Sequence, residues 1–152
     1  MIKTAVEIRK PYLGLVHRGT IKSVVKEIFY SFDINNAELS VSFVGDEEIR
    51  ELNNQFRSTD EATDILAFPL NESNPETGVI IYGDLVISYP TATKQYAKHF
   101  NTVSDEIIYL VIHGVLHLFG FDHTTIGEKK KMFSIQNELF KQIKNDNKLL
   151  NE

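Results

Sequence analysis

The chain has 152 residues, of which 42% are hydrophobic and 24% are charged, and its net charge is −5. This length suits one domain, and the composition is that of a globular protein, which excludes intrinsic disorder. The absence of cysteine excludes disulfides, thiolate zinc sites and a cysteine nucleophile.

The distribution of charged and apolar residues excludes further classes of protein. The acidic total argues against a protein that coats nucleic acid through a basic surface. The basic run of Lys129, Lys130 and Lys131 is more typical of a solvated helix face than of a binding groove. No apolar run approaches the roughly 20 residues that span a bilayer, and the first residues lack the apolar core of a signal peptide. We therefore expect a cytoplasmic protein.

Four strands are predicted from alternating or continuous apolar residues. Their ranges are 2–9, 39–43, 63–68 and 79–88. Pro69 is expected to stop the third strand, and the residues at 71–78 are typical of a loop. The pair Gly83 and Asp84 is expected to interrupt the fourth strand.

Helices are predicted from apolar residues at three- and four-residue spacing. The expected helices cover 17–31, a short segment that begins at Asp46, 91–99, 102–119 and 126–144. Acidic residues suit the start of the second of these helices, and Thr102 followed by Asp105 resembles a capping box. About four strands and five helices that alternate irregularly indicate an α+β or mixed α/β layered domain.

The helix expected at 102–119 is apolar on nearly all sides, so we expect it to be buried, yet it carries His113 and His117. Side chains four residues apart lie on one helix face, about 5–6 Å apart at Cβ, so both imidazoles can reach one ion. Gly120 then provides a left-handed helix end, and the chain turns back to present His123. The result is a His-x3-His-x5-His motif with a glycine turn inside it.

Three protein ligands and one open position are the pattern of a catalytic zinc site. We therefore predict that His113, His117 and His123 hold one Zn²⁺ ion per chain, although imidazole ligands also accept other divalent transition metals. The alternative is that two of these histidines are core residues bonded to main-chain carbonyls and that His123 lies at the surface.

Zinc peptidases with the motif His-Glu-x-x-His-x-x-Gly-x-x-His share this spacing, and their glutamate is the general base. In this chain Gly114 occupies the glutamate position. Either another residue is the base, or the reaction is a different one. Hydrolysis of a phosphodiester is a natural alternative, because a metal ion can activate water and polarise a phosphoryl oxygen with less need for an adjacent carboxylate.

Several stretches of the chain resemble the YbeY endoribonucleases of bacteria, and together they cover most of its length. The matching segments are His113-Gly-Val-Leu-His-Leu-Phe-Gly-Phe-Asp-His123, Leu52-Asn53 with Phe56-Arg57, Thr63-Asp-Ile-Leu-Ala-Phe-Pro69, and Gly83-Asp-Leu-Val-Ile-Ser88. Two positions depart from the family's pattern: Ala62 replaces a usual proline and Ala67 a usual serine. Both are small residues at positions that are not metal ligands.

The resemblance implies a single α+β domain, with a mixed sheet flanked by helices and a zincin-like metal-binding helix in the core. It also implies metal-dependent cleavage of single-stranded RNA, in 3′-end maturation of 16S rRNA and in ribosome quality control. The expected partners are then the small ribosomal subunit and its rRNA, with no membrane or DNA partner. Residues 1–152 are expected to form one metal-dependent endoribonuclease domain.

Arg57 matches the functionally important arginine of the family, and its guanidinium is suited to bind phosphate bidentately. From the residues alone, a surface salt bridge with Asp60 or Glu61 is the alternative.

The sequence leaves undecided whether three acidic residues lie beside the metal. Asp122 could orient a ligand histidine or serve as a turn residue, and Asp64 and Asp84 could reach the site or cap a strand end.

Two rival functions also remain open. One is a zinc peptidase with an atypical base, and the other is a ribosome-assembly factor whose zinc is structural.

Overall fold

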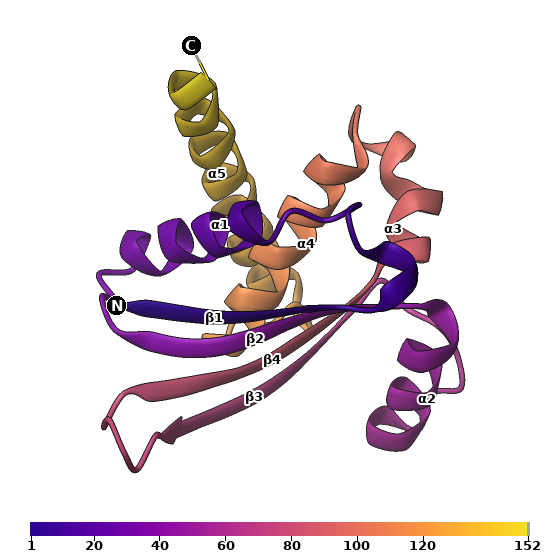
Figure 1. Cartoon of the computed structure of the whole chain (residues 1–152), viewed down its shortest axis with the longest axis horizontal. Coiled ribbons are helices and arrows are strands. Elements are labelled where there is room, and N and C mark those ends of the chain that lie inside the picture. The colour runs from indigo at the N-terminus through magenta and orange to yellow at the C-terminus, as the bar shows by residue number, and fades with distance from the viewer. Residues whose placement is uncertain (152) are drawn as a thin grey trace.

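The computed structural model describes the main chain of residues 1–151 and the side chains of residues 1–146. The described residues form one mixed sheet, with strand order β1-β2-β4-β3, and five α-helices (Figure 1). The strands are β1 (Ile2–Ile8), β2 (Ala37–Val44), β3 (Ile65–Ser73) and β4 (Ile80–Ser88). The helices are α1 (Arg18–Ser31), α2 (Asp46–Arg57), α3 (Tyr89–Gln95), α4 (Val103–Leu118) and α5 (Ile126–Asn151).

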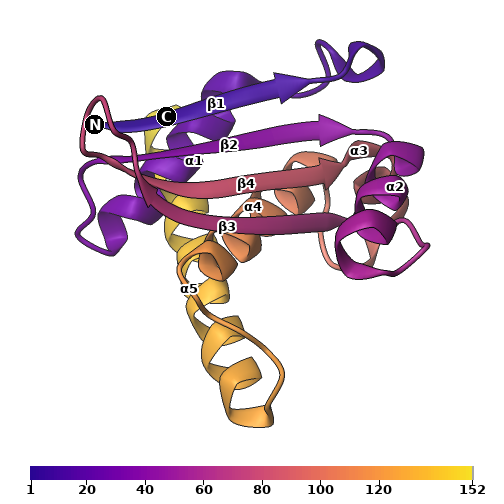
Figure 2. The same cartoon turned by 90° about the horizontal axis from the view of Figure 1, so that it is seen from below.

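Strands β1, β2 and β4 run parallel to one another, and β3 runs antiparallel to β4 at one edge. Helices α1, α4 and α5 cover one face of this sheet (Figures 1 and 2). The α+β fold with a mixed sheet, four strands and five helices is therefore confirmed. No helix in the described part of the chain is long and apolar enough to cross a membrane.

Alternation along the strands divides the apolar residues between two cores. The larger core lies between the sheet and helices α1, α4 and α5, and it takes residues such as Val41, Phe43 and Leu85. The smaller core lies on the other face of the sheet, below α2, and consists of Val44, Ile49, Leu66 and Val86, with Leu52 and Phe68 at its margin. The smaller core fixes α2, and therefore Arg57 at the end of α2, against β3.

Helix α4 is the central element, as its apolar composition predicts. Ten of its sixteen residues are buried. The predicted cap at its start is present, because Oγ1 of Thr102 accepts a hydrogen bond from the N–H of Asp105 at 3.1 Å. At Gly114 the helix lies so close to the sheet that a Cβ atom would be 2.7 Å from side-chain atoms of both Ile65 and Leu85.

Strand β3 differs from the prediction, because it continues through Pro69 to Ser73 and leaves only a short turn before β4. The strand lies at the edge of the sheet, where proline is tolerated because its missing N–H removes no bond from the ladder. The register with β4 shifts between Pro69 and Glu72. Gly83, opposite Pro69, has a φ of +145°, and a Cβ there would collide with the carbonyl of Phe68. The expected interruption of β4 is thus an irregularity within a continuous strand.

Two helices also have different bounds from those predicted. Helix α3 begins at Tyr89 rather than at residue 91, because Ser88 caps it by accepting a hydrogen bond from the N–H of Thr91 at 3.2 Å. It ends at Gln95 and is followed by a 3₁₀ turn, Tyr96–Lys98. Helix α5 continues to Asn151, past the last residue of its apolar stripe. A further 3₁₀ turn, Lys10–Tyr12, follows β1 and was not predicted.

Asp46 joins the start of α2 to the segment that begins α3. Its carboxylate accepts hydrogen bonds from the hydroxyls of Ser88 and Thr91, each at 2.6 Å, and from the ammonium group of Lys94 at 2.8 Å. These bonds, above all the one from Lys94, lower the pKa of Asp46 from 3.8 to about 2. The carboxylate is therefore more stable in the folded chain than in the unfolded chain.

We expect Asp46→Asn to lower the free energy of unfolding by about 1 kcal/mol at pH 7. The pKa is depressed in the folded state, so this stabilisation is fully present above pH 4 and is lost as the pH falls toward 2. Urea denaturation of both proteins at several values between pH 7 and pH 2.5 measures the difference. The control is Asp60→Asn, which alters an exposed ion pair with Arg50. A difference in the free energy of unfolding that stays the same at all pH values would contradict the prediction.

Candidate metal centre

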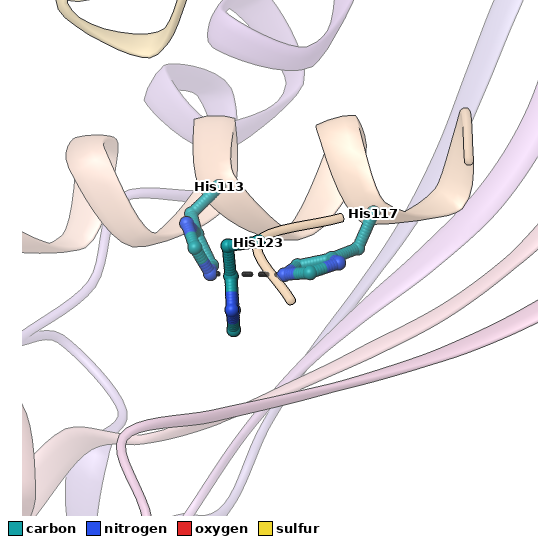
Figure 3. Close-up of side chains that lie close together, drawn as sticks. All are labelled: His113, His117 and His123. Carbon is teal, nitrogen blue, oxygen red and sulfur yellow. Dashed lines mark hydrogen bonds between the residues drawn. The ribbon is translucent and has the colours of Figure 1, made fainter. Parts of the chain in front are cut away.

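Three imidazoles lie together beside α4, as Figure 3 shows. His113 and His117 come from the second half of α4, and His123 comes from the loop that follows it. One ring nitrogen of each histidine lies within 4.8 Å of those of the other two. The Nε2 atoms of His113 and His117 are 3.1 Å apart. The predicted convergence of the three rings is therefore confirmed.

The loop after α4 turns back at Gly120, whose φ of +99° lies in the left-handed region that favours glycine. The N–H of Gly120 donates to the carbonyl of His117, and the N–H of Phe121 donates to the carbonyl of Leu116, both at 3.0 Å. These two bonds form a Schellman motif, so the predicted left-handed helix end is confirmed. The turn brings the ring of His123 to 5.0 Å from the ring of His117, measured between centroids.

Asp122 has the contacts of a turn residue. Its Oδ1 accepts a hydrogen bond from the N–H of His123 at 2.7 Å, and its Oδ2 accepts one from the hydroxyl of Thr124 at 3.5 Å. The side chain is exposed. Among the described residues it forms no hydrogen bond with any of the three imidazole rings, and it acts on His117 through its charge, which favours the protonated imidazole.

Gln136 on α5, which the sequence analysis did not single out, holds the ring of His113. Its side chain is 2% exposed. Its Nε2 donates to the carbonyl of Tyr109 at 3.3 Å, so its Oε1 faces Nδ1 of His113 at 3.1 Å. Because an amide oxygen can only accept, Nδ1 carries the proton and Nε2 carries the lone pair. That lone pair lies on the side of the ring that faces His117.

Burial favours the neutral form of two of these histidines. It is the main cause that lowers the pKa of His117 to about 4, and the neighbouring His113 and His123 add to the effect. Burial also lowers the pKa of His113, although the hydrogen bond with Gln136 partly opposes it. A metal ion binds neutral imidazole. At pH 7 both rings are therefore in the form that a metal requires.

The three nitrogens fit a tetrahedral ion. At zinc–nitrogen distances of 2.0–2.1 Å, two ligands of a tetrahedral zinc ion lie about 3.4 Å apart, which is close to the observed 3.1 Å between His113 and His117. Among the described residues, the group of candidate ligands contains these three histidines and no fourth residue. The site could therefore hold one divalent ion and leave a coordination position for another molecule.

The histidines line a cavity of about 520 Å³, and Arg57 lines it too. The Nη2 of Arg57 donates to the main-chain carbonyl of Ala67 at 3.3 Å, so the usual serine hydroxyl at position 67 is not needed for this contact. The alternative salt bridge of Arg57 does not form within the described residues, because Asp60 pairs with Arg50 at 2.8 Å instead. An exposed guanidinium and three imidazoles therefore face one cavity.

Asp64 and Asp84 lie in different surroundings. Asp64 lines the cavity, where its Oδ1 accepts from the N–H of Ile65 at 2.7 Å and its Oδ2 accepts from Gln95 at 3.0 Å. Asp84 lies within β4, accepts a hydrogen bond from the hydroxyl of Ser40, and is not among the residues that line the cavity. Of these two acids, only Asp64 is placed to act on the site.

The packing at Gly114 explains why the glutamate of the zinc peptidases has no counterpart here. A larger side chain at this position would have to displace Ile65 and Leu85, because α4 rests directly on the sheet. A side chain at this point of α4 therefore requires Ile65 and Leu85 to repack, and glycine itself has no group that transfers a proton. Any proton transfer in the site must involve a residue from another element or the substrate itself.

One sequence signal could have pointed to Gln136. The buried stripe of α5 contains Met132, Leu139 and Ile143, and Gln136 falls on the same stripe by its spacing. A polar residue on a buried stripe requires a hydrogen-bond partner. The sequence does not say that the partner is His113, which lies 23 residues away on another helix.

Comparison with known proteins gives consistent matches. A family model described as Endoribonuclease YbeY matches residues 12–144. A protein of Persephonella marina named Endoribonuclease YbeY is 42% identical over 125 residues, which is 82% of each chain. A protein of Sulfurihydrogenibium with the same name is 36% identical over 136 residues, which is 89% of each chain.

A solved structure agrees with these matches. The solution structure of a protein from Thermotoga maritima is 31% identical to this chain and has a TM-score of 0.65. The similarity covers 96% of this chain and 91% of that one. The family match extends over most of the sequence and includes the whole histidine motif. The chain therefore belongs to the YbeY endoribonuclease family.

Proposed function

We propose that the chain is a metal-dependent endoribonuclease that cuts single-stranded RNA. The observation that carries this proposal is the convergence of three imidazoles and one exposed guanidinium on a single cavity, in a member of the YbeY family. Relatives of the chain bear the name endoribonuclease. Zn²⁺ is the proposed ion, because three histidines and an open position are a ligand set of catalytic zinc.

The residues of the cavity have separate roles in the proposed reaction. His113, His117 and His123 would hold the ion, which when bound supplies a Lewis acid for water and for a phosphoryl oxygen. The guanidinium of Arg57 donates to the non-bridging oxygens of the scissile phosphate and stabilises the negative charge that develops on them. The bond from Arg57 to Ala67 uses one N–H group and leaves the others for the phosphate.

Three features favour this function over its rivals. A peptidase of the zinc-peptidase type would use a glutamate directly after the first histidine as its base, and Gly114 stands there in this chain. A purely structural zinc would be closed by four protein ligands, whereas three candidate ligands face an open cavity here. Arg57 adds a cation suited to a phosphate. Each of these points supports the hydrolysis of a phosphodiester.

The proposed setting is 3′-end maturation of 16S rRNA and ribosome quality control, as the family resemblance implies. The small ribosomal subunit and its rRNA are then the partners, the action takes place in the cytoplasm, and neither a membrane nor DNA takes part. Residues 1–152 act as one endoribonuclease domain. Because the net charge of the chain is −5, the RNA is bound through local groups of the site rather than through overall attraction.

We expect His117→Ala to abolish both the bound metal and the cleavage of RNA, because two imidazoles bind zinc much more weakly than three. Elemental analysis and a cleavage assay on the same preparation measure the two losses. His17→Ala, which removes an exposed histidine before α1, is the matched control and should keep both properties. Full cleavage by the His117 variant would rule out the proposed site.

We expect Arg57→Ala to lower kcat by about 100-fold while the metal content stays unchanged, because the guanidinium acts on the transition state and not on the ion. Arg57→Lys should restore only part of the rate, since an ammonium group cannot bind phosphate bidentately. Arg50→Ala is the control, because Arg50 lies on the same helix and pairs with Asp60 at the surface. Loss of metal from the Arg57 variants would instead indicate a structural role.

We expect Gln136→Leu to weaken zinc binding by about 10- to 100-fold, because the ring of His113 loses the acceptor that fixes its tautomer. Competition with a chromophoric chelator measures the affinity, and thermal denaturation of the metal-free protein shows whether the fold is kept. Gln142→Leu, on the exposed side of the same helix, should change neither quantity. An unaltered affinity in the Gln136 variant would mean that His113 is oriented by other contacts.

A further inference from the structure

A second cavity, of about 690 Å³, lies beside the metal centre. It shares Asp64 and His113 with the first cavity and extends between α4, α5 and the segment that joins α3 to α4. The ring of His113 stands at this boundary: its Nδ1 bonds to Gln136, which lines the second cavity, and its Nε2 faces His117 in the first. A molecule that occupied both cavities would pass along His113.

Aromatic rings form much of the wall of the second cavity. Phe100 lies 5.2 Å from Tyr109 and 5.1 Å from Phe140, and Phe133 lies 6.1 Å from His113, all measured between ring centroids. The four rings are half-buried. Phe100, Tyr109 and Phe133 belong to neither hydrophobic cluster of the described residues. These three rings therefore do not serve to fill the core.

Phe133 lies near the start of α5 (Ile126–Asn151), and the first turns of that helix extend away from the sheet (Figure 2). Elsewhere in the described part of the chain, large apolar side chains on the helices mainly face the sheet or a neighbouring helix. A phenyl ring that faces a cavity beside a metal centre leaves apolar area available to a ligand.

Polar groups in the same cavity are held in fixed positions. Glu106 is only 6% exposed and accepts a hydrogen bond from Nε2 of Gln95 at 2.6 Å, and the same Nε2 donates to Asp64 at 3.0 Å. The hydroxyl of Tyr109 donates to Oδ1 of Asn137 at 2.7 Å. The amide N–H groups of Asn137 are left to donate to a ligand, and the carboxylates have lone pairs to accept from one.

The residues of this wall suit a flat, uncharged ligand that carries hydrogen-bonding groups along its edge. The wall carries two carboxylates, Asp64 and Glu106, and one ammonium group, Lys98, so its charge gives a phosphate no net attraction. The aromatic rings suit stacking on a π-face, and the carboxylate and amide groups suit the N–H donors and the acceptors on the edge of a base. The phosphate of the same nucleotide is suited to the neighbouring cavity, where Arg57 and the histidines lie.

We propose that the second cavity is a nucleobase subsite, which takes one unpaired base of the RNA beside the scissile phosphate. The proposal rests on the proposed function and adds to it a reason why the substrate must be single-stranded. A base that is stacked and paired in a duplex cannot enter a cavity, whereas an unpaired base can turn into it. Phe133 and Phe100 are binding residues of this subsite.

Abasic substitution in the substrate tests the proposal with the zinc-loaded protein. A short single-stranded RNA is prepared with one abasic nucleotide at each position in turn, and kcat and KM are measured for each. We expect one position next to the cleaved bond to raise KM by about tenfold, which is the loss expected when one stacked base is removed. A scan with no sensitive position next to that bond would overturn the proposal.

Variants of the protein provide the second arm. Phe133→Leu should raise KM for the intact RNA by about tenfold, and the abasic substitution should then add little, because both changes remove the same contact. Tyr30→Leu, an exposed aromatic on α1, is the control and should keep the KM of the unaltered protein. Phe100→Leu, on a different segment, should repeat the effect if the first variant loses zinc or stability.

A fluorescent base separates binding from cleavage. When 2-aminopurine is placed at the sensitive position, stacking in the cavity should quench its fluorescence on mixing with the unaltered protein, and Phe133→Leu should abolish the quenching. If the zinc-loaded protein cleaves no RNA, the proposed function fails. If it cleaves RNA but both phenylalanine variants keep KM and quenching, the subsite alone is refuted, and the cavity serves another ligand such as a side chain of a protein partner.

Discussion

The contact between α4 and the sheet at Gly114 is the constraint on which the rest of the site depends. Because this position has no side chain, the helix rests directly on Ile65 and Leu85. That contact fixes the rotation of α4 about its axis. Residue 113 precedes Gly114 and residue 117 follows it by three, so their imidazoles emerge at the edge of the contact, beside β3, and not within the core. The positions of two of the three histidines are thus set by packing.

The same contact decides which chemistry the motif can support. In zinc peptidases the residue after the first histidine is a glutamate that transfers protons. In this chain that residue is a glycine buried against the sheet, and the cavity of the histidines is lined by the guanidinium of Arg57, which reaches it from α2 on the far side of β3, together with the carboxylates of Asp64 and Asp122. A guanidinium in the cavity suits an anionic substrate. Two proteins can therefore share the spacing of three histidines and catalyse different reactions.

The sequence predicts those features that arise from contacts close along the chain. The histidine site follows from four-residue spacing on one helix and from a glycine turn. The helix end follows from Gly120 itself, because glycine readily adopts the left-handed φ that is observed there. The position of Arg57 depends instead on how α2 packs against β3, and only the family resemblance pointed to it. Gln136 was missed for the same reason, because its partner lies on another helix.

The error at Pro69 has a related cause. Proline interrupts a strand in the interior of a sheet but is tolerated in an edge strand. Residues 63–69 contain no signal that this strand lies at an edge. That position is decided by the order of all four strands. The loop expected at 71–78 was too long for the same reason, because it included the end of β3.

The edge position of β3 has a consequence for how the molecule behaves among its own copies. An open edge with regular main-chain donors and acceptors is a template on which another chain can add a strand. Pro69 removes one donor from β3, and the irregular pairing between Pro69 and Glu72 distorts the strand further along. Residues 65 and 67 of the same strand line the cavity of the histidines. The residues that line the cavity and the features that discourage self-association therefore lie on the same edge strand.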